Sequence, residues 1–281
     1  MFHKVLDVAD FGSSDLFQSN KKTLFVTEDA VDPSFLIADL LREIVSIGDA
    51  RCSFVLLRHP FSHYKTVTAK LGRNLQVPAV QSRFDILDVV EQTSSSLSHG
   101  SLSGTNESPL LSLDMMSDFT ASASTTKDRL QLFVENLLTI LRANQKNSEL
   151  LLIDDLSLLL DLGMDLATFV ILVKDLWELP WLKGLCLGFW SGHSREEKPS
   201  QIRAMDRYLC GLADHVIRIS AFPHHLPSKD AFCLLQIQRR IVLRTKEEAK
   251  KTENVPLLST FHVRLSDRNV TYIPPGLSVP L

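Results

Sequence analysis

The sequence predicts an α/β fold: a mainly parallel, twisted sheet flanked by helices, with antiparallel strands at its C-terminal edge. Three observations support this class. Short apolar runs such as residues 150–153, "LLLI", are typical of strands that a parallel sheet buries on both faces. Stretches with helical periodicity separate these runs. Residues 230–244 and 261–274 instead alternate apolar and polar side chains, as antiparallel strands do.

In the N-terminal half, strands and helices alternate. A β-branched and aromatic run at 23–27 predicts the first strand, and apolar residues at helical spacing over 36–45 predict the first helix. A second buried strand is expected at 52–59, followed by a helix that Gly72 ends. Residues 84–90 favour a further short strand.

Residues 91–127 differ in character from the rest of the chain. They are rich in Ser and Thr and show no hydrophobic periodicity, so burial cannot offset the entropy of ordering them. We expect a disordered insertion within one domain that spans residues 1–281. A segment this long is either functional, for example as a phosphorylation target, or a tolerated linker.

The C-terminal half continues the alternation. A helix at 130–141 leads into the strand at 150–153. The following elements are a helix at 163–179, a buried strand at 182–192, and a helix that passes into a strand over 206–222. The two alternating C-terminal segments are expected to lie at the sheet edge, with a hairpin turn around residues 267–269.

Composition excludes several classes of protein. The 281 residues are 44% apolar and carry a net charge of −3, which is ordinary for a globular chain and gives no strongly basic surface, while a local basic patch is still allowed. No signal peptide and no bilayer span is visible. We therefore expect a protein of the cytoplasm or nucleus, with no membrane partner and with reduced, scattered cysteines: Cys52, Cys186, Cys210 and Cys233.

The first strand-to-helix junction lacks a phosphate-binding loop. A P-loop of the form GxxxxGK[ST] needs glycines for backbone approach and a lysine for charge, and residues 27–35 contain neither. Three carboxylates stand there instead, and they would repel a triphosphate by several kcal/mol, on the order of magnitude that Coulomb's law gives. The residues of this degenerate P-loop are Thr27, Glu28, Asp29, Asp32 and Ser34.

The helix after this junction is expected to begin without a bound anion. Asp is among the best N-cap residues, and Asp32 stands directly before Pro33. Proline suits the first helical position, because the missing N–H has no intrahelical partner there. The carboxylate of the chain itself is therefore predicted to satisfy the helix N-terminus.

Asp154 and Asp155 close the buried strand at 150–153 and resemble the Walker B element that holds magnesium in P-loop ATPases. Without phosphates to bridge, a magnesium ion would bind weakly here. The alternative is that the pair caps the next turn or accepts hydrogen bonds from loop N–H groups. No catalytic set can be assembled, so we expect no enzyme activity, no cofactor and no metal.

Two separated stretches carry a resemblance to a known family. They are "SFVLLRHPFSHYKTVTAKLG" at 53–72 and "LLLIDDLSLLLDLGM" at 150–164. In the first, Phe61, Ser62, His63 and Tyr64 precede Lys-Leu-Gly, and in the second Asp-Asp-Leu-Ser precedes Leu-Gly-Met. The chain resembles Elongator complex protein 6 across most of its length, and the Ser-rich insertion is the main departure.

The resemblance implies a RecA-like fold without its own nucleotide site. It also implies a heterohexameric ring with the fourth and fifth Elongator subunits, two copies of each, in contact with core Elongator subunits. That ring binds tRNA under ATP control and supports modification of the wobble uridine, U34. The chemistry of this modification belongs to another, radical-SAM and acetyltransferase, subunit.

Two groups of residues are candidates for contacts with partners. Phe61, Ser62, His63 and Tyr64 follow a strand end, where such folds place function, so we expect an interface or loop anchor; a hydrogen-bonded turn is the alternative. Basic residues are candidates for tRNA phosphate contacts, with a solvated face as the alternative, and they are Arg239, Arg240 and Arg244. Aromatic side chains are candidates for exposed ring contacts, or else belong to the core: Trp177, Trp181, Phe189 and Trp190.

Rival functions stay open at this point. A recombinase-paralogue-like scaffold, or an ATPase-like protein, acting on DNA would share the fold. Arg58 or Arg218, each at or near a strand end, could complete the ATP site of a neighbouring subunit, and the sequence does not choose between them.

Overall fold

The fold is known from a computed structural model of the chain. It describes residues 21–28, 31–46, 50–72, 74–91, 126–144, 148–191, 200–222, 232–243, 253–266 and 270–274. Within these residues the strands form one sheet of nine strands. The remaining residues, including 92–125 of the predicted insertion, lie outside the described part.

Six parallel strands make up one part of the sheet. Across the sheet their order is β3 (Phe84–Asp88), β2 (Cys52–Leu56), β4 (Leu150–Ile153), β5 (Gly184–Trp190), β1 (Lys21–Thr27) and β6 (His215–Ala221). Three antiparallel strands extend it beyond β6: β7 (Cys233–Leu243), β8 (Glu253–Leu265) and β9 (Val270–Ile273). The predicted division into a parallel sheet and an antiparallel C-terminal edge is confirmed.

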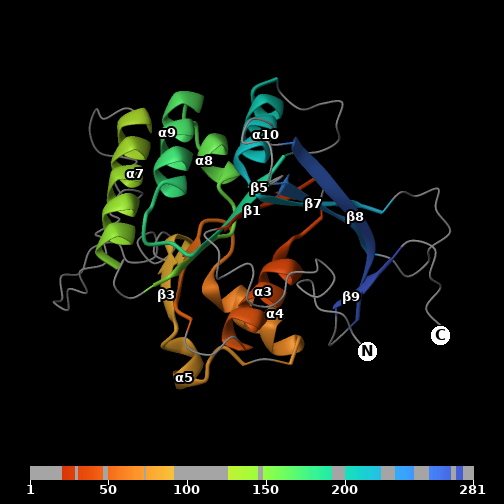
Figure 1. Cartoon of the computed structure of the whole chain (residues 1–281). Coiled ribbons are helices and arrows are strands. Elements are labelled where there is room, and N and C mark those ends of the chain that lie inside the picture. Colours follow the sequence, from red (N-terminus) through yellow and green to blue (C-terminus); the bar gives the residue numbers. More distant parts are fainter. Residues whose placement is uncertain are drawn as a thin grey trace.

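Helices cover both faces of the parallel strands (Figure 1). One face carries α3 (Ser34–Ser46), α4 (Phe61–Lys70) and α5 (Pro78–Gln81). The other carries α7 (Thr126–Ala143), α8 (Ser157–Asp161), α9 (Leu166–Trp177) and α10 (Ser200–Leu212). No helix of the described residues is long and apolar enough to span a membrane.

The two helical layers bury two separate cores. Side chains alternate along a strand, so neighbours in β1 enter different cores: Leu24 and Val26 pack on the α7–α10 side and Phe25 on the α3 side. All three side chains are at most 2% exposed. Burying each of them stabilises the fold by roughly 1.5–3 kcal/mol, so both faces of β1 need a helical cover.

Several element boundaries differ from those that the sequence predicts. The second strand ends at Leu56 rather than at residue 59. The backbone N–H groups of residues 57–59 donate to the side chain of Asp154, which follows β4, and so they do not continue the sheet. α4 already begins at Phe61, directly after Pro60. α7 begins at Thr126, so the last two residues of the predicted insertion are helical. Gly72, with φ of 83°, follows the end of α4 as predicted.

Two of the aromatic residues considered for exposed ring contacts belong to the core instead. Phe189 is 1% exposed and Trp177 is 9% exposed. Both pack in the core on the α7–α10 side, where the rings of Phe169 and Phe189 meet edge to face with centroids 6.2 Å apart. Phe189 is covered because β5 is buried along almost its whole length, and Trp177 lies on the buried face of α9.

We expect Gly188→Ala to destabilise the fold strongly. A Cβ at Gly188 would overlap the carbonyl oxygen and carbon of Asp154, while Leu156 N–H donates to the Gly188 carbonyl at 2.9 Å. Relieving the overlap must separate β5 from the end of β4, at a cost of about 3 kcal/mol or more. Urea unfolding measures the change. The control is Gly211→Ala in α10, where no atom lies within 4 Å of the added Cβ; it should be neutral or stabilise by up to about 1 kcal/mol. Equal stability of the two variants would contradict the close approach.

Candidate functional site

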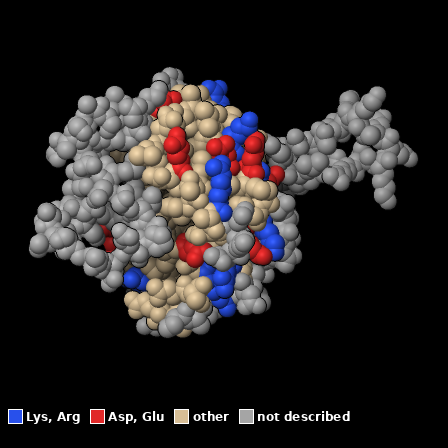
Figure 2. Space-filling view, turned by 90° about the vertical axis from the view of Figure 1, so that its left-hand side faces the viewer, with Lys and Arg blue, Asp and Glu red and all other residues tan. Residues whose placement is uncertain are grey.

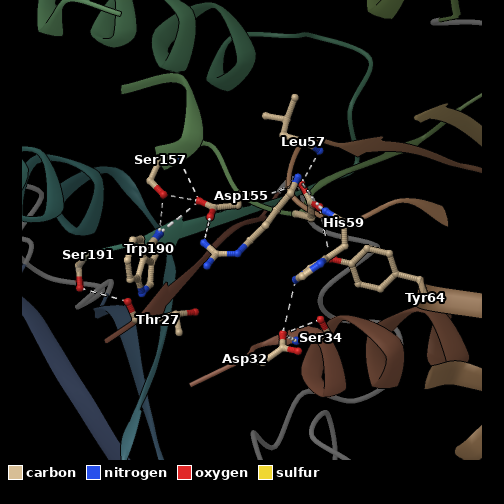
Figure 3. A network of polar contacts seen from close by, with 12 residues as sticks. Thr27, Asp32, Ser34, Leu57, His59, Tyr64, Asp155, Ser157, Trp190 and Ser191 are labelled. Atoms are coloured by element: carbon tan, nitrogen blue, oxygen red, sulfur yellow. Dashed lines mark hydrogen bonds and ion pairs between the residues drawn. The ribbon is translucent and has the colours of Figure 1, made fainter. Parts of the chain in front are cut away.

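The candidate site lies at the edge of the sheet where β1, β2, β4 and β5 end (Figure 3). Parallel strands bring their carboxyl ends to one edge, which is where α/β proteins place their binding sites. The loops that follow these strands contribute polar side chains from four distant parts of the sequence. Figure 3 shows these side chains directed toward one another in a single network.

Asp154 is the most buried carboxylate of this network, at 3% exposure. Its Oδ1 accepts from the N–H of Leu57 at 2.7 Å, and its Oδ2 accepts from the N–H groups of Arg58 at 3.0 Å and His59 at 3.2 Å. The Tyr64 hydroxyl donates to Oδ2 at 3.3 Å. Burial raises the pKa of Asp154 to about 6, although the three backbone N–H groups act in the opposite direction. One side chain therefore holds the whole turn after β2.

Asp155 binds the other side of the same edge. Its Oδ2 accepts from the Arg58 guanidinium at 2.6 Å, and its Oδ1 accepts from the Ser157 N–H at 2.9 Å. The Arg58 guanidinium also lies over the Trp190 ring, 5.0 Å from the ring centroid. Ser157 Oγ in turn accepts from the Trp190 N–H at 3.2 Å. Both members of the Walker-B-like pair are thus engaged by groups of the chain itself.

The β1–α3 junction is closed by its own side chains. Asp32 Oδ1 accepts from the N–H of Ser34 at 2.9 Å and from its hydroxyl at 2.6 Å. α3 begins at Ser34, one residue later than the sequence predicts, but a carboxylate of the chain does bind the N-terminus of this helix. Thr27 ends β1, and its carbonyl accepts from the N–H of Ser191 at 2.9 Å. Asp29, which the sequence also places at this junction, lies outside the described residues.

Glu28 forms part of an ion-pair cluster at the same junction. The Arg218 guanidinium of β6 donates to Glu28 at 3.1 Å and to the two carboxylate oxygens of Asp206 at 3.1 and 3.2 Å. It also lies 2.9 Å from the sulfur of Cys210. Arg58 and Arg218, considered above as donors to a neighbouring ATP site, are therefore both held by carboxylates within the chain.

The Phe61–Tyr64 element starts α4 and mixes buried with exposed side chains. Phe61 and Tyr64 are buried, and the Phe61 N–H donates to Asp88 at 2.6 Å. His63 is half-buried and lies 2.9 Å, from Nε2 to Oγ, from the hydroxyl of Ser34. Ser62 is exposed. The element therefore anchors the turn through three residues and leaves Ser62 as the side chain available to a partner.

The residues predicted to contact tRNA lie far from this edge or outside the description. Arg239 and Arg240 belong to β7, where they pair in register with Leu257 and Pro256 of β8. Arg244 lies outside the described residues. Sequence reasoning named Ser157 within the Asp-Asp-Leu-Ser motif and Trp190 among the candidate aromatic contacts, but it did not predict that Ser157 accepts from the Trp190 N–H or that Arg58 lies over the Trp190 ring.

The strand order and this edge define the class of protein. β1, which precedes the acidic junction, and β4, which ends in the acidic pair, are separated by the single strand β5, in a mainly parallel sheet with antiparallel strands beyond β6. The chain is a RecA-like α/β protein. A solved structure with which it aligns is a KaiC-like protein of Pyrococcus horikoshii, at 14% identity and a TM-score of 0.49, covering 94% of this chain and 96% of that one.

Comparison with protein families identifies the group within this class. The profile of the family described as Elongation complex protein 6 matches residues 7–176, which include α3, α4, the acidic pair and α9. The chain belongs to this family and is therefore a subunit of the Elongator complex. A search of curated proteins found no match.

We expect the stability contributed by Asp154 to fall as the pH rises. The pKa is about 6 in the folded chain against 3.8 for the free side chain, so between these values the folded state binds more protons than the unfolded state. The contribution is therefore fully present below pH 3.8 and is lost as the pH rises through 6. Asp154→Ala leaves one buried and two partly buried N–H groups without their acceptor and should cost about 2 kcal/mol at pH 7. The deficit should be about 2 kcal/mol larger at pH 4.

Urea unfolding of both proteins at pH 4, 5, 6 and 7 measures this difference. Glu135→Gln is the matched control, because Glu135 is an exposed carboxylate on α7, away from this edge; its effect should stay within about 0.5 kcal/mol. A deficit of Asp154→Ala that shrinks toward pH 4 would show that the carboxyl is ionised more readily in the folded chain, and would reverse the assigned direction.

Proposed function

We propose that this Elongator subunit is a non-catalytic scaffold. In this proposal it forms a heterohexameric ring with the fourth and fifth subunits, two copies of each, which binds tRNA and supports modification of the wobble uridine. The observation that carries the proposal is the acidic β1–α3 junction. Where a P-loop would present N–H groups and a lysine to phosphate, the chain places Asp32 as its own N-cap and Glu28 in an ion pair with Arg218.

Electrostatics support the absence of nucleotide chemistry in this subunit. Asp154 and Asp155, the carboxylates that could ligate magnesium, accept hydrogen bonds from Leu57, Arg58 and other donors of the chain. A triphosphate would have to displace these contacts and approach two further carboxylates. At 4 Å and an effective dielectric constant of 20, each like-charge pair costs about 4 kcal/mol. We therefore assign ATP binding to neighbouring subunits, and the chemistry to the catalytic subunit.

A single copy of the chain offers a limited surface for RNA. On the face that Figure 2 shows, Lys and Arg side chains alternate with Asp and Glu, and the described residues of this face form no broad basic area. Phosphate contacts of a few residues are weak and salt-dependent, but they add up when several subunits bind one ligand. This supports tRNA binding by the assembled ring, in the cytoplasm or nucleus, rather than by the isolated chain.

Ring assembly tests the proposal. Co-expression of the chain with the fourth and fifth subunits should yield a particle with two copies of each by native mass spectrometry. Ser62→Arg should weaken assembly at least about tenfold, because Ser62 is the exposed member of the candidate interface and a bulky cation there costs little in the monomer. Ala167→Arg, on the exposed side of α9, is the matched control and should assemble normally.

Two results would count against this assignment. Failure to co-assemble under any condition rejects the ring, and loss of assembly in Ala167→Arg but not in Ser62→Arg moves the interface away from α4. The alternative, a recombinase-like scaffold or ATPase-like protein acting on DNA, predicts recombination factors rather than Elongator subunits among proteins purified with the chain. An ATPase-like chain would in addition bind labelled ATP in isolation.

We expect the double variant Arg239→Glu, Arg240→Glu to weaken tRNA binding by the assembled ring roughly three- to tenfold at low salt, because two phosphate contacts are replaced by repulsion. The dependence of affinity on salt should also become shallower. Filter binding over a salt series measures both effects. The double variant Arg203→Glu, Arg207→Glu, at two exposed arginines of α10, changes the net charge by the same amount and is the matched control. Unchanged affinity of the double variant at low salt would reject these residues as contacts.

A further inference from the structure

Three potential metal ligands meet beside the acidic junction, although the sequence predicts no metal site. They are Asp32 before α3, His59 after β2 and His63 in the first turn of α4, and one donor atom from each lies within 4.8 Å of the other two. The Nε2 of His59 is 3.9 Å from Oδ1 of Asp32. Figure 3 shows the His59 ring and the Asp32 carboxylate facing each other, with Ser34 beside Asp32.

Packing holds the two imidazole rings in place. The rings of His59 and His63 stack with centroids 4.4 Å apart and an interplanar angle of 18°. Both meet the buried Tyr64 ring edge to face, at 6.1 and 5.3 Å. Tyr64 and the His59 N–H are themselves bound by Asp154. Packing therefore keeps the two imidazoles next to each other before any ligand arrives, so binding one ion requires a ring rotation but no movement of the backbone turn.

Charge around the cluster also suits a cation. Each imidazole in its neutral form offers a nitrogen lone pair to a cation. Arg58 directly precedes His59 in the sequence, but its guanidinium is paired with Asp155 at 2.6 Å, which offsets its positive charge. Ser34 donates to Asp32 through its N–H and hydroxyl, which fixes the carboxylate in the manner of an outer-shell partner.

We propose that Asp32, His59 and His63 bind a divalent transition-metal cation, with zinc as the reference ion. Two imidazoles and one carboxylate are ligands that zinc accepts, and imidazole disfavours magnesium and calcium. Donor atoms around a tetrahedral zinc with bonds of about 2.0–2.1 Å lie ~3.4 Å apart. Because the stacked rings direct their in-plane lone pairs nearly parallel, at least one imidazole must rotate before both nitrogens can bind one ion at this spacing. The Asp32 carboxylate, in a side chain that is 53% exposed, is open to the ion as it stands.

The ion would join the N-terminus of α3 to the turn that leads into α4. In an ATPase of this fold the same junction holds phosphate, so a metal would replace the ligand with an ion of opposite charge. The three ligands leave a fourth position, which water or a side chain of a neighbouring subunit can fill. The inference concerns the isolated chain and does not depend on ring assembly or on tRNA.

Titration of the purified, chelator-treated chain with Zn²⁺ tests the site. Isothermal titration calorimetry should give one strong site per chain, and Co²⁺ should produce the visible absorption of a tetrahedral complex. His59→Ala and His63→Ala should each weaken the site by about 100-fold or more, and millimolar Mg²⁺ should not compete. His262→Gln, which removes a histidine that packs on Phe222 in another part of the sheet, should leave binding unchanged.

Circular dichroism of each variant separates ligand loss from misfolding. Asp32→Asn provides a second route, because asparagine keeps the N-cap of α3 while it removes the anionic ligand, and it should weaken binding about tenfold or more. The site is rejected if no stoichiometric Zn²⁺ binding occurs. It is also rejected if folded His59→Ala, His63→Ala and Asp32→Asn proteins bind as the unaltered chain does.

Discussion

The carboxylate of Asp154 is the contact on which the rest of the sheet edge depends. It is buried at the end of β4, and Gly188 on β5 allows the neighbouring strand to reach its backbone. From there it accepts hydrogen bonds from three consecutive backbone N–H groups of the turn after β2. These hydrogen bonds end β2 at Leu56. A backbone turn that is buried without such an acceptor would leave its donors unpaired. The position of Arg58, His59 and the start of α4 follows from this one side chain.

The same arrangement explains how a RecA-like edge can be stable without a nucleotide. In this fold, the helix N-terminus and the strand ends expose N–H groups that an anion would satisfy. Here Asp32 caps α3, Asp154 binds the turn after β2, and Asp155 binds Arg58. Each anion is part of the chain, so the edge needs no phosphate to be satisfied. N–H groups that could bind an exchangeable anion are instead bound permanently by side chains of the chain.

The sequence predicted most helices and strands, because their patterns depend on interactions between residues that are close together in the chain. Period two, helical periodicity and the N-cap at Asp32 each depend on a few neighbouring residues. Contacts across the sheet could not be predicted in this way. Arg58 and Asp155 are 97 positions apart, and their pairing depends on β4 lying next to β2. Of the two interpretations that the sequence left open for Phe189, the core position is the one observed, because β5 is covered by both of its neighbouring strands.

The histidine pair illustrates the same limit and shows what the fold adds. His59 and His63 are four residues apart, yet they do not share one helix: His59 lies in the turn and His63 in α4. Their stacking therefore comes from the bend at Pro60 and from Tyr64, not from helical spacing. Asp32 joins them only because β1 and β2 end at the same edge of the sheet. The edge formed by the strand ends therefore brings distant side chains together even where the sequence has no P-loop motif, and the chemistry of those side chains decides which charge the edge could accept.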